Sequence, residues 1–384
     1  MRIAIDIRVV GKKRTGDETV FFHLTKHLIR LFVGTEHDLF LLTDCHDSDS
    51  LSSLALRFGL DETITNVTIV SLPCLNRFVW TAWVAPQYLR REHIDVYHTQ
   101  YIVPFFISPS TKVVTHVHDV SFRAFPHLIA WSDRFFLWLL MGRSLRRADC
   151  VIAVSSFTAQ EIVKYYPVAS EKIAVVPNAL GDDYLQTVEG FSQRISDKYH
   201  LPKKYLLYVG TLQPRKNIPY LIRTFACLAE RVEDVCLVIV GNLEAHNADP
   251  LVSEALEALP SSVRLRVFFP GYVHVDDLPY IYFMARAFVF PSLYEGFSIP
   301  LLEAFSAGVP VVASDIAVHR EVAGKCVFYV PTDGLAEFCE KLYIIVTDDE
   351  MRSRYISRGR ERLVFYSWDR SARIVHDLYM RFFS

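Results

Sequence analysis

Alternation between two kinds of apolar pattern runs along the whole chain and constrains its fold more than any other feature. Short apolar runs typical of buried strands, such as RIAIDIRVV at residues 2–9, alternate with longer segments whose apolar residues recur at helical spacing. After that first run, the helical spacing places Val20, Phe21, Leu24 and Leu28 on one face. Strands that alternate with helices form parallel sheets, because each helix carries the chain back to the start of the next strand. The pattern therefore predicts an α/β protein.

The pattern starts afresh after a polar, turn-rich stretch near residues 179–202. A chain of 384 residues is too long for one typical domain and suits two. We expect one α/β domain over residues 1–180, a second over 181–365, and a C-terminal helix over 366–384 that packs back towards the first. Strands are expected at residues 2–9, 40–43, 67–70, 96–98, 112–117, 151–154 and 173–176, and then at 205–209, 236–240, 265–269, 288–290, 309–313 and 327–330.

Composition and charge exclude several classes of protein. A hydrophobic fraction of 51% with 22% charged residues indicates an ordinary folded interior, and a net charge of -2 gives no general electrostatic attraction for nucleic acid. The chain has no apolar stretch of membrane-spanning length, and Met1 runs directly into the first strand without a signal peptide. The seven cysteines are scattered without CxxC spacing, which predicts reduced thiols. We therefore expect a soluble cytoplasmic protein.

The stretch FVFPSLYEGFSIPLLEAFSAGVPVVAS at residues 288–314 carries the strongest functional signal. It reads as a strand, a loop with Glu295, a short helix with Glu303 and a second strand. Proline at position 300 suits the first turn of that helix. The free amides of residues 297–299 at the helix start form a ready anion-binding end. Two carboxylates beside an anion site suit a ligand with both hydroxyls and phosphates, such as a nucleotide sugar.

A second phosphate-binding candidate is the loop GTLQPRKN at residues 210–217, between a strand and a helix. Arg215 offers a forked donor and Lys216 a mobile ammonium to a diphosphate. The alternative is a solvated cap over the first helical turn. Cations are disfavoured at a helix N-terminus, so this alternative needs compensation.

A histidine candidate ends a strand of the first half, in THVHDVSF at residues 115–122. A residue just past the carboxyl end of a parallel strand faces the ligand-binding edge of the sheet. His118 stands there and can hydrogen-bond a sugar hydroxyl or exchange a proton near neutral pH. His116 is expected on the opposite side of the sheet.

Other signals favour structural roles. Asp47, Ser48 and Asp49 mimic a DxD metal motif, but turn and helix-cap use explains them better. No HExxH, paired metal-ligand spacing or GxGxxG fingerprint is present, so no metal or dinucleotide cofactor is expected. The basic and aromatic segment at residues 131–147 suits either anionic lipid headgroups or core packing. Core packing is favoured, because its apolar residues occupy nearly every face, and peripheral contact with the inner face of the cytoplasmic membrane stays open.

Taken together, these motifs resemble the retaining glycosyltransferases of glycosyltransferase family 4. EGFSIPLLEAFSAGVPVV resembles the E-x7-E motif, VGTLQPRKNI the donor-phosphate loop and HDVSF the active-site histidine segment. ADCVIAVSSFTAQEI, VVPNAL and the late Ser367-Trp368 are similar to further landmarks, in the same order and spacing. The resemblance implies the GT-B fold, in which two Rossmann-like domains with parallel sheets face a deep cleft.

The resemblance also implies residue roles. Arg215 and Lys216 bind the donor diphosphate, Glu303 the ribose, and Glu295 the sugar hydroxyls. The remaining contacts implied for the donor come from Gly16, His118, Phe297, Ser298 and Ile299. Two departures stand out: the first loop reads TGDET where the family often has GxGRY, and GFS replaces GFG. The first departure puts acceptor recognition in doubt.

The family retains anomeric configuration without a required metal, because the cation pair stabilises the departing diphosphate. MRIAIDIR with HDVSF looks most like mannosyltransferases of surface-polysaccharide assembly, which favours GDP-mannose and a glycan or lipid-linked glycan acceptor. A UDP- or dTDP-sugar donor stays open, as do a nucleotide-sugar epimerase and a non-catalytic sugar-nucleotide binding protein. A glycoside hydrolase using the two glutamates is a further alternative, but it leaves the cation pair unused. The sequence specifies neither the linkage nor the oligomeric state.

Overall fold

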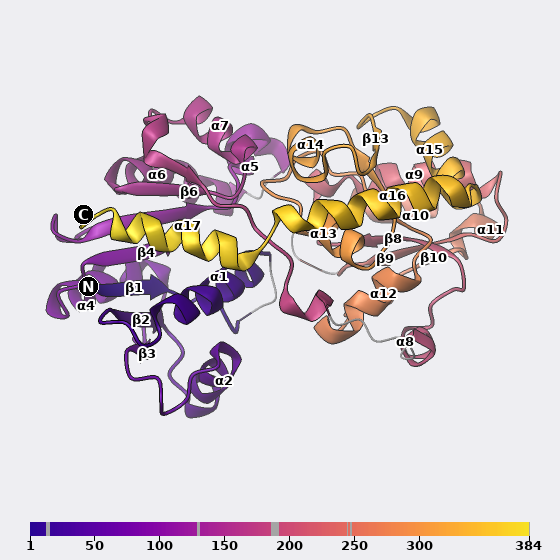
Figure 1. The fold of residues 1–384 in the computed structure, drawn as a ribbon. Helices are drawn as coiled ribbons and strands as arrows, with labels where there is room; N and C mark the ends of the chain where they lie inside the picture. Colours follow the sequence, from indigo (N-terminus) through magenta and orange to yellow (C-terminus); the bar gives the residue numbers. More distant parts are fainter. Residues whose placement is uncertain (13–15, 129–130, 186–191, 244, 246–247, 384) are drawn as a thin grey trace. The chain divides into compact units, whose positions relative to one another are not determined.

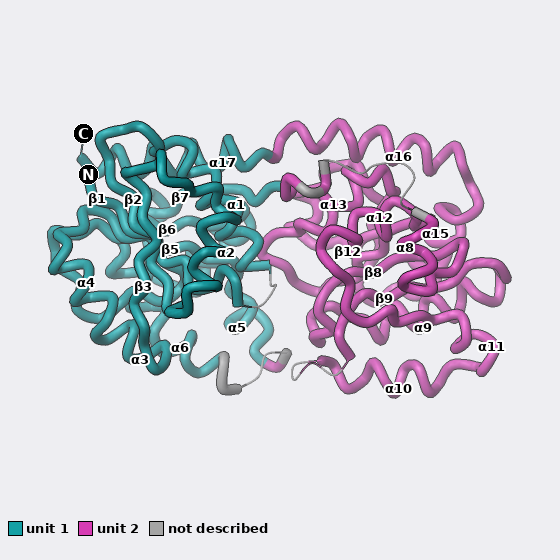
Figure 2. The backbone as a smooth tube through the Cα atoms, turned by 90° about the horizontal axis from the view of Figure 1, so that it is seen from below, with its two compact units in different colours: residues 1–126, 131–179, 367–384 teal, residues 127–130, 180–366 magenta. Residues whose placement is uncertain are grey.

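The computed structural model describes residues 1–12, 16–128, 131–185, 192–243, 245 and 248–383 (Figure 1). The chain divides into two units (Figure 2): unit 1 holds residues 1–126, 131–179 and 367–384, and unit 2 holds residues 127–130 and 180–366. Each unit is built on one parallel β-sheet, which confirms the predicted α/β class.

Unit 1 contains a seven-stranded sheet in the order β3-β2-β1-β4-β5-β6-β7. Every recorded strand pairing in it is parallel. Its strands are β1 (Arg2–Asp6), β2 (Asp38–Thr43), β3 (Val67–Ser71), β4 (Val96–Gln100), β5 (Lys112–Val117), β6 (Cys150–Ala153) and β7 (Ile173–Val175). Its helices are α1 (Gly16–Phe32), α2 (Ser48–Phe58), α3 (Arg77–Val79), η1 (Trp80–Val84), α4 (Ala85–Arg91), α5 (Ser121–Ala124), α6 (Trp131–Arg147), α7 (Ser156–Tyr165), η3 (Ser170–Lys172) and α17 (Trp368–Met380). The short helix η2 (Pro126–Leu128) begins in unit 1 and ends in unit 2.

Unit 2 contains a six-stranded sheet in the order β10-β9-β8-β11-β12-β13, with every recorded pairing parallel. Its strands are β8 (Tyr205–Val209), β9 (Cys236–Val240), β10 (Val267–Phe268), β11 (Ala287–Phe290), β12 (Val311–Ser314) and β13 (Phe328–Val330). Its helices are η4 (Asp182–Leu185), α8 (Ser192–Tyr199), η5 (Pro214–Lys216), α9 (Ile218–Ala229), α10 (Leu251–Glu257), α11 (Ser261–Arg264), η6 (Val275–Asp277), α12 (Leu278–Met284), α13 (Ile299–Ser306), α14 (Ala317–Ala323), α15 (Leu335–Thr347), α16 (Asp349–Arg362) and η7 (Leu363–Phe365).

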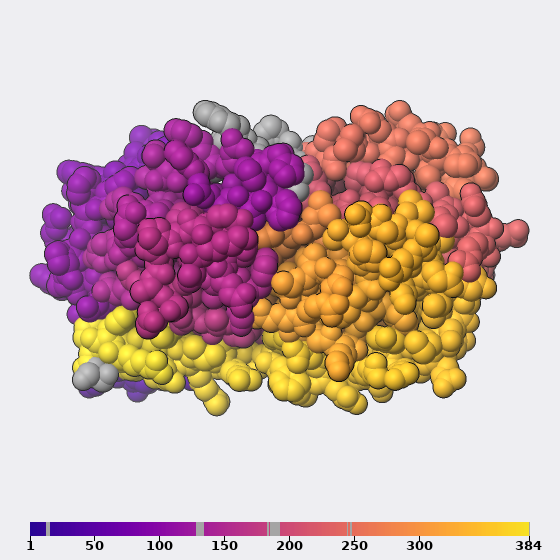
Figure 3. All heavy atoms as spheres, turned by 90° about the horizontal axis from the view of Figure 1, so that it is seen from above, coloured from indigo at the N-terminus to yellow at the C-terminus, as the bar shows by residue number. Residues whose placement is uncertain are grey.

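The C-terminal helix α17 belongs to unit 1 and packs along α1. Its buried face carries Val375 and Tyr379, and His27 of α1 contacts Asp369 at 2.7 Å between Nδ1 and Oδ1. The hydroxyl of Ser371 also donates to the carbonyl oxygen of Pro177 at 2.6 Å. In the space-filling view, yellow atoms of this last segment lie against the purple and magenta atoms of unit 1 (Figure 3). The C-terminal helix α17 therefore forms part of the packed structure of unit 1.

Two local expectations are confirmed and one is wrong. Asp47 caps α2, because its side chain accepts a hydrogen bond of 2.7 Å from the amide of Ser50. Each predicted strand overlaps an observed one. The cysteines are not all reduced thiols, since Cys227 of α9 and Cys339 of α15 form a disulfide across 112 residues of sequence. Composition and spacing did not reveal this pair, because the two cysteines meet only when both helices pack.

Candidate functional site

Two loops of unit 2 meet because their strands are neighbours. β8 and β11 pair in parallel, so their carboxyl ends lie at the same edge of the sheet. The loop of residues 210–217 follows β8, and the loop of residues 291–298 follows β11. The amide of Leu293 donates a hydrogen bond of 2.8 Å to the carbonyl oxygen of Arg215, which joins the loops directly. The sheet thereby brings together residues about 80 positions apart in the sequence.

Arg215, Lys216 and Glu295 form a buried charge cluster on these loops. Nη1 of Arg215 lies 2.8 Å from Oε2 of Glu295, and Nζ of Lys216 lies 2.5 Å from Oε1. Arg215 also donates to the carbonyl oxygen of Tyr294 at 3.1 Å. Only 16%, 10% and 6% of the three charged side chains is exposed. Two cations therefore share one carboxylate at a position with little exposure to solvent.

The electrostatics of the cluster favour the ionised carboxylate strongly. Burial alone raises the pKa of Glu295, but the charges of Lys216 and then Arg215 overcome it and lower the pKa to about 2. Lys216 is no solvated cap, since it is 8% exposed. The sequence assigned the cations to a diphosphate and the carboxylate to a sugar, whereas the structure pairs them with one another. Those ligand roles stay predictions.

The start of α13 presents the predicted amide cluster. The helix begins at Ile299, has Pro300 in its first turn, and shows no side-chain cap. Ser298 is fully buried, and its hydroxyl has no hydrogen-bond partner among the described residues. The ring of Phe297 packs edge-on against Tyr366, with centroids 5.7 Å apart. A helix start without a side-chain cap suits an anion, and the anion-binding role of residues 297–299 stays a prediction.

Glu303 lies one turn into α13 and is held by a residue that the sequence did not single out. The hydroxyl of Tyr282, on α12, donates a hydrogen bond of 2.8 Å to Oε2 of Glu303. Burial and then the charge of Glu303 raise the pKa of Tyr282 well above its usual value, so the phenol stays protonated. Glu303 is 9% exposed. The hydrogen bond fixes the orientation of the carboxylate predicted to bind ribose, and no local motif marks Tyr282 as its partner.

In unit 1, His118 follows β5, and its ring stacks on that of His116. Their ring centroids lie 4.8 Å apart with an interplanar angle of 17°. The expectation that the two lie on opposite sides of the sheet is therefore wrong. Side chains alternate along a strand with a period of two, so residues i and i+2 share a face.

The polar contacts of His118 come from residues that the sequence analysis missed. Nε2 lies 3.1 Å from Oε1 of Gln100, and Nδ1 lies 3.8 Å from Oδ1 of Asp17. The ring of Tyr101 packs 5.6 Å away, and Tyr101 has a φ of +51°, a left-handed backbone that is uncommon without glycine. Gln100 is the last residue of β4, the neighbour of β5, and Tyr101 follows it. This shared edge of the sheet was the signal that could have found them.

Gly16 is the first residue of α1 and is exposed. A Cβ atom added there would meet no atom within 4 Å, and the backbone is not left-handed. Neither crowding nor strain within the described residues therefore requires glycine at this position. The preceding residues 13–15 of the predicted loop lie outside the described part.

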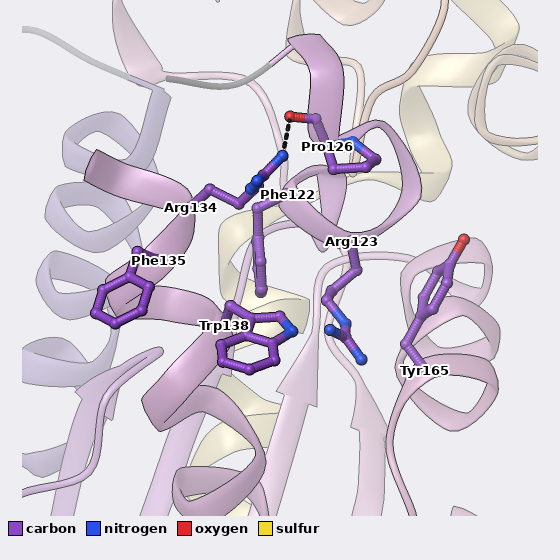
Figure 4. A pocket seen from close by; sticks show the side chains of 7 residues that line it. All are labelled: Phe122, Arg123, Pro126, Arg134, Phe135, Trp138 and Tyr165. Carbon is purple, nitrogen blue, oxygen red and sulfur yellow. Dashed lines mark hydrogen bonds between the residues drawn. The ribbon is translucent and has the colours of Figure 1, made fainter. Parts of the chain in front are cut away.

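A pocket of about 570 Å³ in unit 1 lies beside the segment that carries His118 (Figure 4). Its walls come from α5, α6 and α7, and α5 begins three residues after His118. The side chains of Phe135 and Trp138 are about half exposed, so the predicted core packing of α6 is wrong for this face. The lining residues are Phe122, Arg123, Pro126, Arg134, Phe135, Trp138 and Tyr165.

The described residues lack two features that would change the chemistry or the location of the site. Among them, no group of three or more histidine, cysteine, aspartate or glutamate side chains is placed to hold a metal ion. No helix in that part of the chain has both the length and the apolar character needed to cross a membrane.

Comparison with known proteins agrees with the motifs. The model of Glycosyltransferase Family 4 matches residues 15–183, and that of Glycosyl transferases group 1 matches residues 192–362. The O-antigen chain mannosyltransferase B of Escherichia coli is 29% identical over 259 residues, which is 67% of each chain. The serotype-specific mannosyltransferase WbdA of Escherichia coli is 28% identical over 61% of this chain, but the match spans only 29% of that longer protein.

The fold also matches solved structures at low sequence identity. A glycosyltransferase from Rickettsia africae superimposes with a TM-score of 0.73 at 16% identity, covering 99% of this chain and 97% of that one. Two successive family models, the two parallel α/β units and these neighbours agree with one another. The chain belongs to the GT-B glycosyltransferases of family 4, with a second half of the group 1 type.

Proposed function

We propose that this protein transfers mannose from GDP-mannose to a glycan or lipid-linked glycan acceptor, with retention of anomeric configuration and without a required metal ion. The observation that carries the proposal is the buried cluster of Arg215, Lys216 and Glu295 at the carboxyl ends of β8 and β11. Relatives named as an O-antigen chain mannosyltransferase and as a serotype-specific mannosyltransferase support the choice of sugar, and the first supports surface-polysaccharide assembly. Within the family, a cation pair at this place serves the donor diphosphate.

The cluster explains how donor binding redistributes charge. Without a ligand, the carboxylate of Glu295 neutralises part of the charge of two cations. A donor diphosphate gives Arg215 and Lys216 a second anionic partner and frees Glu295 to accept hydrogen bonds from sugar hydroxyls. As the glycosidic bond breaks, negative charge grows on the departing diphosphate, and the two cations stabilise that charge at the moment of reaction. The cations thus supply the positive charge that a metal ion supplies in other transferases.

The acceptor is proposed to bind unit 1, at the pocket beside α5. Arg123 and Arg134 line it, and the guanidinium group of Arg123 lies over the ring of Tyr166, 5.5 Å from its centroid. Arg134 instead donates to the carbonyl oxygen of Pro126 at 2.9 Å (Figure 4). Half-exposed rings of Phe135 and Trp138 beside these guanidinium groups suit an acceptor that carries both an anionic group and apolar faces. The same exposed rings support peripheral contact with a membrane surface from the cytoplasmic side.

A donor panel tests the function directly. The purified chain is incubated with GDP-mannose, UDP-glucose, ADP-glucose or dTDP-glucose, and thermal stabilisation and sugar transfer to short mannose oligosaccharides with and without an octyl tail are measured. We expect stabilisation and transfer with GDP-mannose, and loss of transfer in Lys216→Ala with a preserved fold. Stabilisation limited to UDP- or dTDP-sugars overturns the choice of donor. Undiminished transfer by Lys216→Ala overturns the assigned site, and a new epimer formed without acceptor identifies an epimerase.

A further inference from the structure

The ring of His118 is the outermost of three stacked imidazoles. His98 on β4 and His116 on β5 are parallel within 5°, with centroids 5.7 Å apart, and His116 stacks in turn on His118. The strand register explains the arrangement, because Gln100 pairs with His116 and His98 lies two residues before Gln100. All four side chains therefore share one face of the sheet.

The stack is enclosed on its long side and at its inner end. The ring of Phe21, on α1, lies 5.4, 5.3 and 5.9 Å from the rings of His98, His116 and His118, tilted by about 60° to each. At the inner end, Nδ1 of His98 lies 2.6 Å from the hydroxyl of Tyr379, on α17. His98 and His116 are essentially inaccessible, and His118 is 7% exposed. The helix wall and Tyr379 leave the three rings little room to rotate.

Two of the three imidazoles are held in an environment that does not satisfy them. Both ring nitrogens of His116 and Nε2 of His98 lack a hydrogen-bond partner among the described residues. Burial, and then the neighbouring His118, lowers the pKa of His98 to about 3 and that of His116 well below its usual value. Both are therefore neutral near pH 7. A buried donor without an acceptor costs free energy, and an apolar side chain would fill the same space without that cost.

The outer ring, that of His118, has polar neighbours, which the ring of His116 lacks among the described residues. Oε1 of Gln100 lies 3.1 Å from Nε2 of His118, where it can accept a hydrogen bond from that nitrogen. Nδ1 lies 3.8 Å from Oδ1 of Asp17, which is beyond hydrogen-bond distance. A flat neighbour at 4.8 Å keeps the ring of His118 parallel to the stack and therefore keeps Nε2 directed at Gln100. A branched aliphatic neighbour presents no such plane.

We propose that His116, backed by His98, is a positioning residue that holds His118 in one ring orientation and one tautomer for glycosyl transfer. The inference rests on the proposed function in assigning His118 to the transfer reaction. Gln100 contributes by accepting a hydrogen bond from Nε2 of His118, and the hydroxyl of Tyr379 on α17 holds His98 at the inner end of the stack. All of these residues belong to unit 1.

Two substitutions at one position separate positioning from packing. His116→Phe keeps a flat ring in the stack and removes the nitrogens, whereas His116→Leu keeps apolar bulk and removes the plane. His23→Phe is the matched control, because His23 is another buried histidine of unit 1 and stacks on Trp368 rather than on this column. The full-length chain, labelled with ¹⁵N-histidine, reports the tautomer of His118 through its ring nitrogen shifts, and steady-state assays report kcat and donor KM.

We expect His116→Leu to lower kcat about tenfold with donor KM unchanged within about twofold, because orientation matters in the transition state more than in binding. Its His118 spectrum should show exchange between tautomers. His116→Phe should restore the single Nε2–H tautomer and most of kcat, and His23→Phe should leave both unchanged. Should His116→Leu fail to fold, Gln100→Leu carries the test, since removing the acceptor must release the tautomer.

An unaltered His118 tautomer and an unaltered kcat in folded His116→Leu, or in Gln100→Leu where the first does not fold, overturn the proposal. Equal losses of kcat in the leucine and phenylalanine variants also overturn it, because a flat ring then has no special role. If the unmodified chain transfers no sugar from any donor, the proposed function fails. The tautomer measurement still decides whether the stack positions His118.

Discussion

Replacing Glu295 by glutamine removes a carboxylate that pairs with both Arg215 and Lys216. The pKa of Glu295 falls from an ordinary 4.5 to about 2, and each tenfold change in proton affinity is worth about 1.4 kcal/mol. Glu295→Gln should therefore lower the free energy of unfolding by about 3 kcal/mol at neutral pH. The side chain is 6% exposed, so solvent screens this value little.

The sign of the pH dependence follows from the lowered pKa. The stabilisation is complete above the unfolded-state pKa near 4.5 and is lost as pH falls towards about 2. Urea unfolding of the two proteins should therefore give a constant difference from about pH 5 to 8. Below about pH 4.5, Glu295 of the unmodified protein becomes protonated in the unfolded state before it does in the folded state. The difference in the free energy of unfolding between the two proteins should therefore shrink there.

Ligand binding adds an independent check on the same cluster. In Glu295→Gln the two cations lack their carboxylate, so GDP should raise the melting temperature of the variant more than that of the unmodified chain. Glu340→Gln is the matched control, because Glu340 pairs with Arg231 at 2.6 Å while half exposed, and surface pairs contribute about 0–1 kcal/mol. If the Glu295→Gln protein is as stable as the control variant at pH 7, the buried cluster does not contribute the stability expected of it.

Three further predictions concern other parts of unit 2. Glu303→Gln should weaken GDP binding about tenfold in calorimetry, because a charge-assisted hydrogen bond to ribose is lost. Tyr282→Phe should weaken it less. Equal affinity of the unmodified chain and both variants for GDP contradicts the ribose assignment. Gly308→Ala should lower the free energy of unfolding by about 1 kcal/mol, since Gly308 has a φ of +68°, and an unchanged urea midpoint argues against strain there. Reductant should lower the free energy of unfolding of the unmodified chain by about 2–5 kcal/mol, because the disulfide between Cys227 and Cys339 closes a loop of 112 residues. It should not change the stability of Cys227→Ser. A melting temperature of the unmodified chain that does not respond to reductant contradicts the bond.

The fold could be predicted from the sequence because its signals are local. Each strand of both sheets is a short apolar run bounded by turn residues, and the helix spacing between runs specifies parallel pairing. The end of α13 was equally readable, since Gly308 stands where a left-handed residue closes the helix. The exposure of Phe135 and Trp138 was not, because periodicity shows that a helix is apolar without showing which side has a neighbour.

The candidate site could be predicted residue by residue but not as a set of contacts. Motif spacing marked Arg215, Lys216 and Glu295 separately, and only the pairing of β8 with β11 brings them together. Tyr282 and Gln100 escaped notice because a hydrogen-bond partner 18 or 21 residues away leaves no local pattern. The error over His116 had a different origin, since the period of two already required it to share a face with His118.

The anomeric configuration of the product shows whether this protein is a retaining, metal-independent mannosyltransferase. GDP-mannose and a mannose oligosaccharide are incubated with the purified chain in the presence of a chelator, and the new glycosidic bond is assigned by NMR. We expect transfer that proceeds with the chelator present and a new bond with the same anomeric configuration as the bond to the diphosphate in the donor. A product of inverted configuration, or transfer that stops until a divalent metal is returned, contradicts it.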